Sequence, residues 1–187
     1  MRKMRYAFVL AALAVLVTAG AAVAHQVVTI KGTHGNDTLT GTPGADRIAA
    51  LAGDDAVSAG DGNDRIWSGR GNDTSDGGGG NDRVWGGPGN DSVNGGDGND
   101  VLRGRPGDDT INGGGGNDIT WAGRGTDVSN GGDGDDRMHV LARDRQVDHV
   151  DCGPGNDTVW LNAKELDVHV NCEIVKTVTV TGHGGDD

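Results

Sequence analysis

The chain has 187 residues, of which 36 are glycine and only 34% are apolar, so a conventional, densely packed hydrophobic core is excluded. Lys and Arg number 16 against 28 Asp and Glu, which gives a formal net charge of −12. That sign disfavours a nucleic-acid partner. A chain with so much acid and so little apolar surface also needs something to neutralise it before it can fold.

The N-terminal residues 1–24 have the pattern of a secretory signal peptide. Basic side chains precede an apolar run over residues 6–17, and Ala22-Val23-Ala24 forms an A-x-A cleavage site. A membrane anchor is the alternative, but this apolar run is short for a span, which needs about 20 residues. We therefore expect a cleaved signal, no membrane span afterwards and a secreted, extracellular protein. Residues 25–31 then form a short N-terminal lead.

Residues 32–139 consist of twelve nine-residue units without an insertion. Position eight of the unit is apolar except at Ser75, Thr120 and Ser129. Position four is always glycine, namely Gly35, Gly44, Gly53, Gly62, Gly71, Gly80, Gly89, Gly98, Gly107, Gly116, Gly125 and Gly134. Position six is always aspartate, namely Asp37, Asp46, Asp55, Asp64, Asp73, Asp82, Asp91, Asp100, Asp109, Asp118, Asp127 and Asp136.

The chemistry of the unit favours calcium. Glycines allow backbone conformations that are closed to other residues, so the first six positions form a turn that exposes carbonyl groups, and the last three form a short strand with position eight inward. Calcium prefers six to eight oxygen ligands. Each turn offers about half of that number, so two stacked turns should share each ion. In the alternative, a metal-free solenoid, Asn or Ser would often replace the aspartate.

These units resemble the RTX, or hemolysin-type, calcium-binding repeat G-G-x-G-x-D-x-U-x. The resemblance covers 108 residues. It implies an all-β fold, a parallel β-roll or right-handed β-solenoid, with two repeats in each coil and therefore about six coils. It also implies calcium ligands from the position-six side chains and from backbone carbonyls around the position-four glycines, at up to about ten interior sites.

Alternate units differ, which independently indicates a coil of eighteen residues with two different sheets. Position nine of the odd units is mostly small and polar, as in Asn94, Asn112 and Asn130. The even units instead present a basic and aromatic face that includes Arg65, Trp67, Arg83, Trp85 and Trp121. This face either stabilises the sheet through ring contacts or binds a cell-surface glycan or a partner protein. The polar face also has some likeness to the flat faces of ice-binding solenoids.

The register breaks after His139 and returns at Cys152, so that Asp157 is a further candidate ligand. Residues 167–172 alternate as one more strand. Cys152 and Cys172 are about one coil apart, which would place them within disulfide range; two free thiols are the alternative. We expect residues 140–178 to form a degenerate repeat and a disulfide-stapled cap, and residues 179–187 to form a flexible tail.

The sequence contains no H-E-x-x-H, G-x-S-x-G or P-loop motif. We therefore expect a protein that is not an enzyme, and whose function is extracellular calcium binding with calcium-induced folding. The alternatives are an adhesion or glycan-binding module that uses the Arg/Trp face, and a purely structural or ice-binding-like solenoid.

Overall fold

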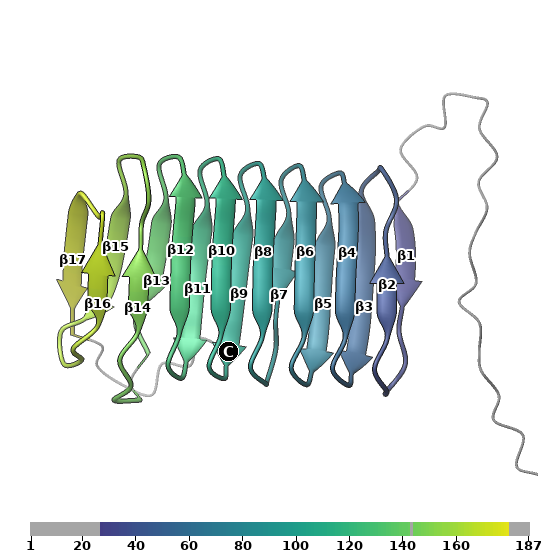
Figure 1. Ribbon diagram of the computed structural model, residues 1–187, viewed down its shortest axis with the longest axis horizontal. Helices are drawn as coiled ribbons and strands as arrows, with labels where there is room; N and C mark the ends of the chain where they lie inside the picture. The colour runs from purple at the N-terminus through teal and green to yellow at the C-terminus, as the bar shows by residue number, and fades with distance from the viewer. Residues whose placement is uncertain (1–26, 143, 180–187) are drawn as a thin grey trace, which may run out of the picture.

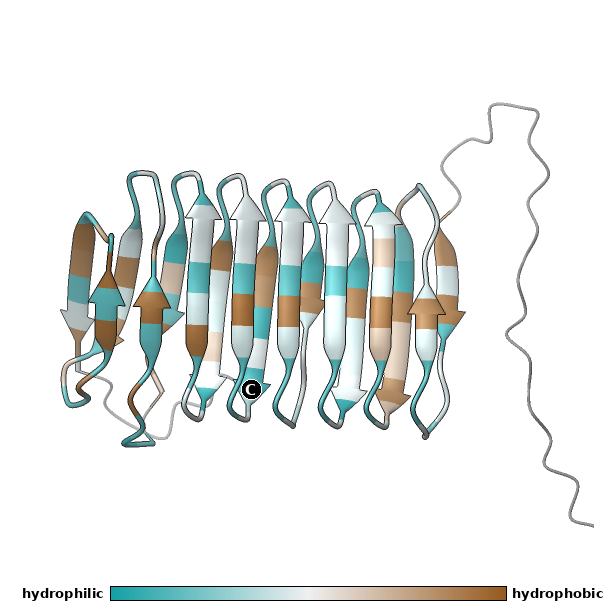
Figure 2. Cartoon of the chain, viewed as in Figure 1, coloured by the Kyte–Doolittle hydropathy of each residue, from teal (hydrophilic) through white to brown (hydrophobic). Residues whose placement is uncertain are grey.

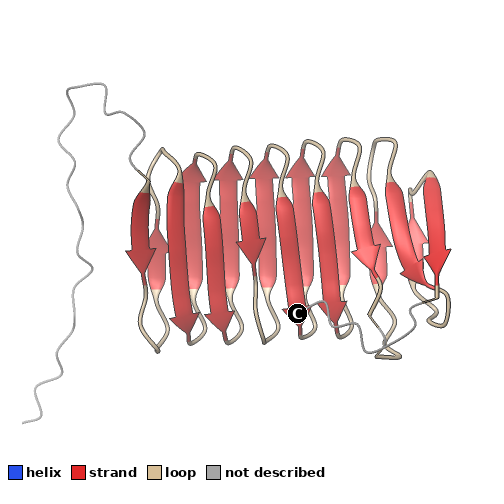
Figure 3. Cartoon of the chain, turned by 180° about the vertical axis from the view of Figure 1, so that it is seen from behind, coloured by secondary structure: helices blue, strands red, loops and turns tan. Residues whose placement is uncertain are grey.

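The computed structural model describes residues 27–142 and 144–179, which form a solenoid of two facing parallel sheets (Figure 1). The chain visits the sheets alternately, so that one contains nine strands in the order β1-β3-β5-β7-β9-β11-β13-β15-β17 and the other eight in the order β16-β14-β12-β10-β8-β6-β4-β2. The described residues contain strands and loops but no helix (Figure 3). The predicted all-β parallel roll is confirmed.

Most strands of the repeats are six residues long, because they continue through positions one to three of the next unit, so the turn is about three residues and not the expected six. The nine-stranded sheet contains β1 (Val28–Lys31), β3 (Asp46–Ala52), β5 (Arg65–Arg70), β7 (Arg83–Trp85), β9 (Val101–Pro106), β11 (Ile119–Arg124), β13 (Arg137–Val140), β15 (Thr158–Asn162) and β17 (Ile174–Val178). The eight-stranded sheet contains β2 (Thr38–Thr40), β4 (Ala56–Asp61), β6 (Thr74–Gly79), β8 (Ser92–Asp97), β10 (Thr110–Gly115), β12 (Val128–Asp133), β14 (His149–Asp151) and β16 (Val168–Val170).

Neighbouring strands pair in a register of eighteen residues throughout the repeats. Trp67 lies opposite Trp85 in the nine-stranded sheet, and Thr74 lies opposite Ser92 in the eight-stranded sheet. Because side chains alternate between the two sides of a strand, position eight points into the roll and positions seven and nine point outward. The predicted eighteen-residue coil therefore explains why odd and even units build two chemically different faces.

The core is thin. Position-eight side chains such as Ile48, Ile66 and Leu102 are buried, yet most strands carry only a short apolar band and β6 carries none (Figure 2). Thr120 and Ser129 are also buried; along the chain Thr120 lies between the two apolar clusters of the interior, and Ser129 lies within the span of the second. Such limited apolar burial contributes little against the conformational entropy lost on folding.

Residues 140–178, where we expected a degenerate repeat and a cap, extend both sheets with strands β14 to β17. The coil lengthens here from eighteen to twenty-one residues, as the backbone bonds of Asp127 and Asp136 to later aspartates show. In the final coil Val168, Val170 and Val175 are exposed by 40–49%. The C-terminal end of the roll is therefore open rather than covered within the described residues.

Cys152 and Cys172 form a disulfide with a Cα–Cα distance of 5.2 Å, so the predicted pairing is confirmed. The bridge joins the turn after β14 to the residue that follows β16 by two positions, and thus links the last two coils. The expected signal peptide and residues 180–187 of the expected tail lie outside the described residues. Within the described ranges, no helix has the length and apolarity needed to cross a membrane.

Candidate metal centre

The position-six aspartates stack along the two edges of the roll, where the turns lie. Turns that leave the eight-stranded sheet form the upper edge in Figure 1, and turns that leave the nine-stranded sheet form the lower edge. At the upper edge the backbone N–H of Asp64 donates to Oδ1 of Asp82 at 2.7 Å. At the lower edge the N–H of Asp73 donates to Oδ1 of Asp91 at 2.9 Å. Each carboxylate is thus held by the preceding coil.

The second carboxylate oxygen is what makes these stacks unusual. Position-six aspartates from Asp46 to Asp136 are at most 3% exposed. A buried acceptor without a partner is costly, and a buried charge without one is more so. The Oδ2 atom is nevertheless buried without a hydrogen-bond partner in Asp55, Asp64, Asp73, Asp82, Asp91, Asp100, Asp109, Asp118, Asp127, Asp136, Asp157 and Asp167.

A backbone carbonyl lies beside the free oxygen wherever position one of the unit is glycine, as in the units of Asp82, Asp91, Asp100, Asp109, Asp118 and Asp136. A Cβ placed on Gly77 would collide with both Asp82 Oδ2 and the carbonyl oxygen of Gly95, so the two oxygens share one small space against the Gly77 Cα. The same arrangement recurs at the lower edge, where Asp91 Oδ2 and the Gly104 carbonyl flank Gly86. The carbonyl of position one in the next coil therefore joins the candidate ligands, a group that sequence reasoning had not singled out.

The position-four glycines fulfil a different steric need. Gly80 has a φ of +120°, and a Cβ there would collide with the carbonyl of Gly62 in the preceding coil. Only glycine combines this conformation with so close an approach. The carbonyls around position four, which the sequence indicated as ligands, therefore form a closely spaced row along each edge.

Burial shifts the proton affinity of the stacked carboxylates. Loss of solvation raises the pKa of Asp82 and Asp91 to about 7 and that of Asp109 to about 8, although a backbone N–H opposes the shift in each case. Neighbouring aspartates of the same stack raise it further. Without a cation, these carboxyl groups are therefore substantially protonated at neutral pH.

The donor set fits a hard cation with oxygen ligands. No group of three or more His, Cys, Asp or Glu side chains in the described ranges could by itself hold a metal ion. A site here would instead combine one free carboxylate oxygen with backbone carbonyls of stacked turns. Calcium accepts that mixture and a flexible coordination number, whereas zinc and copper prefer nitrogen and sulfur.

The aspartates of the first coil differ from the interior ones in their hydrogen bonds. Oδ2 of Asp37 accepts hydrogen bonds from the backbone N–H and hydroxyl of Thr33, and Oδ2 of Asp46 accepts the corresponding bonds from Thr42. These two predicted ligands thus lack the free oxygen that the later aspartates share.

Three acidic residues that the sequence did not reveal extend the stacks beyond the repeats. The N–H of Asp127 donates to Oδ1 of Asp148 at 2.8 Å, and that of Asp148 to Oδ1 of Asp167 at 3.2 Å. At the upper edge the N–H of Asp157 donates to Oε2 of Glu173 at 2.9 Å. Asp148 is 2% exposed, and its pKa is raised to about 7 by burial. One signal was available in the sequence: Asp148-His149-Val150 matches positions six to eight of the repeat, an aspartate followed by any residue and an apolar one.

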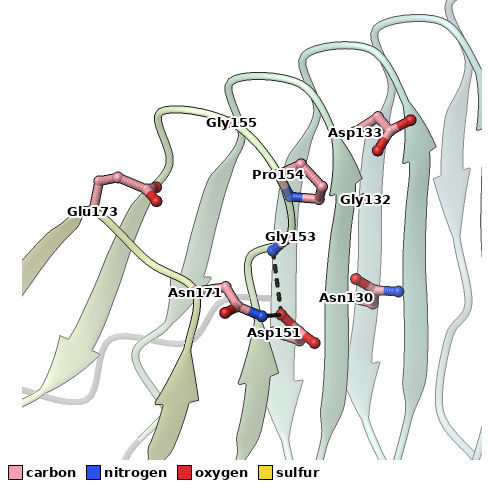
Figure 4. Close-up of a pocket in the computed structure, with 9 residues that line it drawn as sticks. All are labelled: Asn130, Gly132, Asp133, Asp151, Gly153, Pro154, Gly155, Asn171 and Glu173. Carbon is pink, nitrogen blue, oxygen red and sulfur yellow. Dashed lines mark hydrogen bonds between the residues drawn. The ribbon is translucent and has the colours of Figure 1, made fainter.

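An open hollow lies outside the stacks, at the C-terminal end of the upper edge (Figure 4). Asp133, Asp151 and Glu173 line it, and Asp151 Oδ1 accepts hydrogen bonds from the Gly153 N–H and from Asn171 Nδ2. Its acidic side chains are exposed to solvent. The buried carboxylate stacks are therefore the stronger candidate for a metal centre.

The predicted Arg/Trp face lies on the outside of the nine-stranded sheet. Trp67 and Trp85 stack at a centroid distance of 5.0 Å, and Arg65 lies opposite Arg83 in register. Trp121 is two coils further on, separated from Trp85 by Arg103. The structure thus places these residues on one face but in a row rather than around a single pocket.

Comparison with family models gives one match, to the RTX calcium-binding nonapeptide repeat (4 copies). It covers residues 31–66, 40–75, 67–102, 94–129 and 121–141, which together run without a gap over more than half of the chain. No curated protein matches the chain.

Proposed function

The chain belongs to the RTX calcium-binding nonapeptide repeat family, and from this membership we propose that it is an extracellular calcium-binding protein that folds when calcium binds. The observation that carries the proposal is the row of buried carboxylate oxygens without partners at both edges. Calcium would neutralise these charges. We propose a binding role and no catalytic one.

Each interior site would combine Oδ2 of a position-six aspartate with carbonyl oxygens of the stacked turns. The aspartates from Asp55 to Asp136 each supply one such oxygen, which corresponds to about ten calcium sites in the repeats. Asp157 and Asp167 would extend the stacks into the last coils. Asp37 and Asp46 would contribute less, because Thr33 and Thr42 already satisfy them.

The domain plan follows from this function. We propose that residues 1–24 direct export, that residues 32–139 form the calcium-binding repeats, and that residues 140–178 form the disulfide-linked C-terminal coils before a tail. Export would bring the chain to an oxidising environment, which a disulfide requires. It would also bring it to high calcium, which suits extracellular modules of moderate affinity.

Equilibrium dialysis of the purified chain from residue 25 against calcium and magnesium tests the proposal. We expect several calcium ions per chain and much weaker uptake of magnesium, which demands regular octahedral geometry. The triple variant D82N/D91N/D100N should bind fewer calcium ions. The matched control D61N/D97N/D133N removes the same charge from exposed position-three side chains and should bind as the unmodified chain does. If both variants lost the same number of bound calcium ions, calcium uptake would reflect overall negative charge and the proposed sites would be wrong.

A second candidate function is binding at the Arg/Trp face. What favours it is the order of that face: Arg103 lies over Trp121 at 4.4 Å, Trp121 stacks on His139 at 5.0 Å, and His139 stacks on Trp160 at 4.5 Å. A fixed row of side chains is better prepared to bind a partner than mobile ones are. An adhesive role of this kind would operate together with calcium binding.

A further inference from the structure

Charge is divided unevenly between the two outer faces of the roll. Positions seven and nine of the nine-stranded sheet, with their in-register equivalents in the flanking strands, carry no carboxylate. They carry seven cations, namely Lys31, Arg47, Arg65, Arg83, Arg103, Arg137 and Lys176. The same positions of the eight-stranded sheet carry no Lys or Arg, and two of them are Asp76 and Asp151. In a chain with a net charge of −12, one face is thus locally cationic.

Three of these arginines form a straight row. Arg47 lies opposite Arg65, and Arg65 lies opposite Arg83, on the consecutive strands β3, β5 and β7. Strands in a sheet are about 4.8 Å apart, so the row presents one guanidinium at each such step along the roll. Arg47 and Arg83 are exposed and Arg65 is half-buried.

The neighbouring position-nine row limits what this face can recognise. The Trp67 and Trp85 rings are parallel to within 1°, and Lys176 lies over the Trp160 ring at 4.7 Å. Ring faces in this row are therefore mostly covered by the next side chain, except on Trp67, which is 41% exposed and lies opposite the small Ala49. Nucleobases bind proteins largely by stacking on aromatic faces, and neutral sugars use the same surfaces, for which Trp67 offers a single ring. The accessible chemistry that repeats from strand to strand is that of the guanidinium groups.

We propose that the nine-stranded face binds a linear acidic polysaccharide, whose carboxylate or sulfate groups pair with the row Arg47, Arg65 and Arg83. This inference rests on the second candidate function and names its ligand class. Guanidinium groups donate paired hydrogen bonds to carboxylate and sulfate oxygens. The other cations of the face, such as Arg137 and Lys176, would continue the contact along the roll.

The spacing of the row favours a polysaccharide over a nucleic acid. A duplex carries one charge per about 1.7 Å of its axis, several times denser than one guanidinium per strand at about 4.8 Å. An extended sugar residue is about as long as the distance between neighbouring strands. A polysaccharide with one acidic group on each sugar therefore matches the row charge for charge.

Binding of this ligand should depend on calcium. The row exists only when β3, β5 and β7 are paired, and the unneutralised chain repels a polyanion. By reciprocity, a ligand that binds only the folded roll must also tighten calcium binding. The face and the two edges would then act together outside the cell.

The test measures binding of the chain from residue 25 to immobilised dextran sulfate, neutral dextran and double-stranded DNA, with free calcium held constant by dialysis. R47S/R65S/R83S removes the row. The control R70S/R124S/K164S removes three exposed cations outside the position-seven and position-nine rows, two at the lower ends of β5 and β11 and one in the loop after β15. Circular dichroism first establishes that both variants fold with calcium. We expect dextran sulfate to bind and neutral dextran not to bind. The row variant should bind dextran sulfate about tenfold more weakly, and the control should bind as the unmodified chain does.

Equal binding to neutral dextran, an equal loss in the two variants, or no binding of dextran sulfate by a calcium-folded chain would overturn the inference. Tighter binding to DNA than to dextran sulfate would overturn it in favour of a nucleic-acid partner. Failure of the proposed calcium function would appear separately, as a fold that ignores calcium before any polymer is added.

Discussion

At the scale of single residues, the two oxygens of each stacked aspartate have different roles. Oδ1 accepts a backbone N–H from the preceding coil and fixes the side chain, as in Asp91, whose Oδ1 is 2.9 Å from the Asp73 nitrogen. From Asp55 to Asp136, Oδ2 is buried and has no protein partner. Aspartate thus maintains the register of the turns with one oxygen and leaves a second, negatively charged oxygen for a cation. Asn has only one side-chain oxygen and no charge, so it cannot fill both roles.

The position of an aspartate in the stack should decide how much calcium binding depends on it. We expect Asp91→Asn to raise the calcium midpoint of folding clearly, because it removes a buried free oxygen at the lower edge. Asp37→Asn should shift it less, because Thr33 already hydrogen-bonds Oδ2 of Asp37. Calcium titrations of the two variants, followed by circular dichroism, measure the difference. Equal shifts would contradict the division into satisfied and free carboxylates.

Without calcium, the roll should be more stable in acid. The pKa values of Asp82 and Asp109 are raised to about 7 and about 8 in the folded state, against 3.8 ordinarily. The folded state therefore binds more protons, and this contribution is fully present below pH 3.8 and lost as pH rises toward about 8. Calcium-stripped protein should accordingly gain strand signal as pH falls through this range. Strand signal that instead increases with pH would show that these carboxylates are not buried in the metal-free chain.

At the scale of elements, the repeats could be predicted from sequence more fully than the coils that follow them. The glycine at position four and the aspartate at position six of each nine-residue unit identify the turns. The alternation of odd and even units, which repeats every eighteen residues, predicts the pairing of β3 with β5 and of β4 with β6. Asp148 was missed because three extra residues precede it, so that its spacing from Asp127 is 21. Only the sheet register, which depends on pairing in space, shows that it continues the stack.

The disulfide should stabilise the C-terminal coils and little else. It closes a loop of 20 residues, for which chain entropy gives about 3 kcal/mol. Because each coil contacts only its neighbours, reduction in saturating calcium should expose backbone amides of β14 to β17 and leave β5 and β7 protected. Hydrogen exchange with mass spectrometry measures this. Protection lost evenly along the chain would contradict a local role for the bridge.

Two buried serines inside the sheets should respond oppositely to the same substitution. Ser129 Oγ is buried without a partner, so Ser129→Ala should stabilise the calcium-loaded roll by about 1 kcal/mol. Ser75 Oγ is 2.6 Å from Ser68 Oγ, so Ser75→Ala should destabilise it by a similar amount, because Ser68 then lacks its partner. Urea unfolding at fixed calcium compares them. A shift of the same sign in both variants would contradict this reading of the interior.

At the scale of the whole molecule, we expect folding of this chain to depend on a cation, because apolar burial is limited and the net charge is high. The buried side chains include a thin apolar set and a large number of aspartates, and the chain carries a net charge of −12. The composition predicts this dependence, and the alternation between odd and even units indicated the basic face of the nine-stranded sheet. The atomic arrangement that leaves one oxygen of each carboxylate free could not be predicted, because it depends on which coil supplies the hydrogen bond to the other oxygen.

The most direct test of the account is a calcium titration of the chain from residue 25, followed by far-UV circular dichroism at neutral pH. Strand signal should be small in excess chelator, rise cooperatively with calcium, and disappear again when chelator is added. Magnesium should not replace calcium. A chain that shows its full strand signal in excess chelator at neutral pH, and does not change when calcium is added, would contradict the claim that buried, unpartnered carboxylates make this fold depend on calcium.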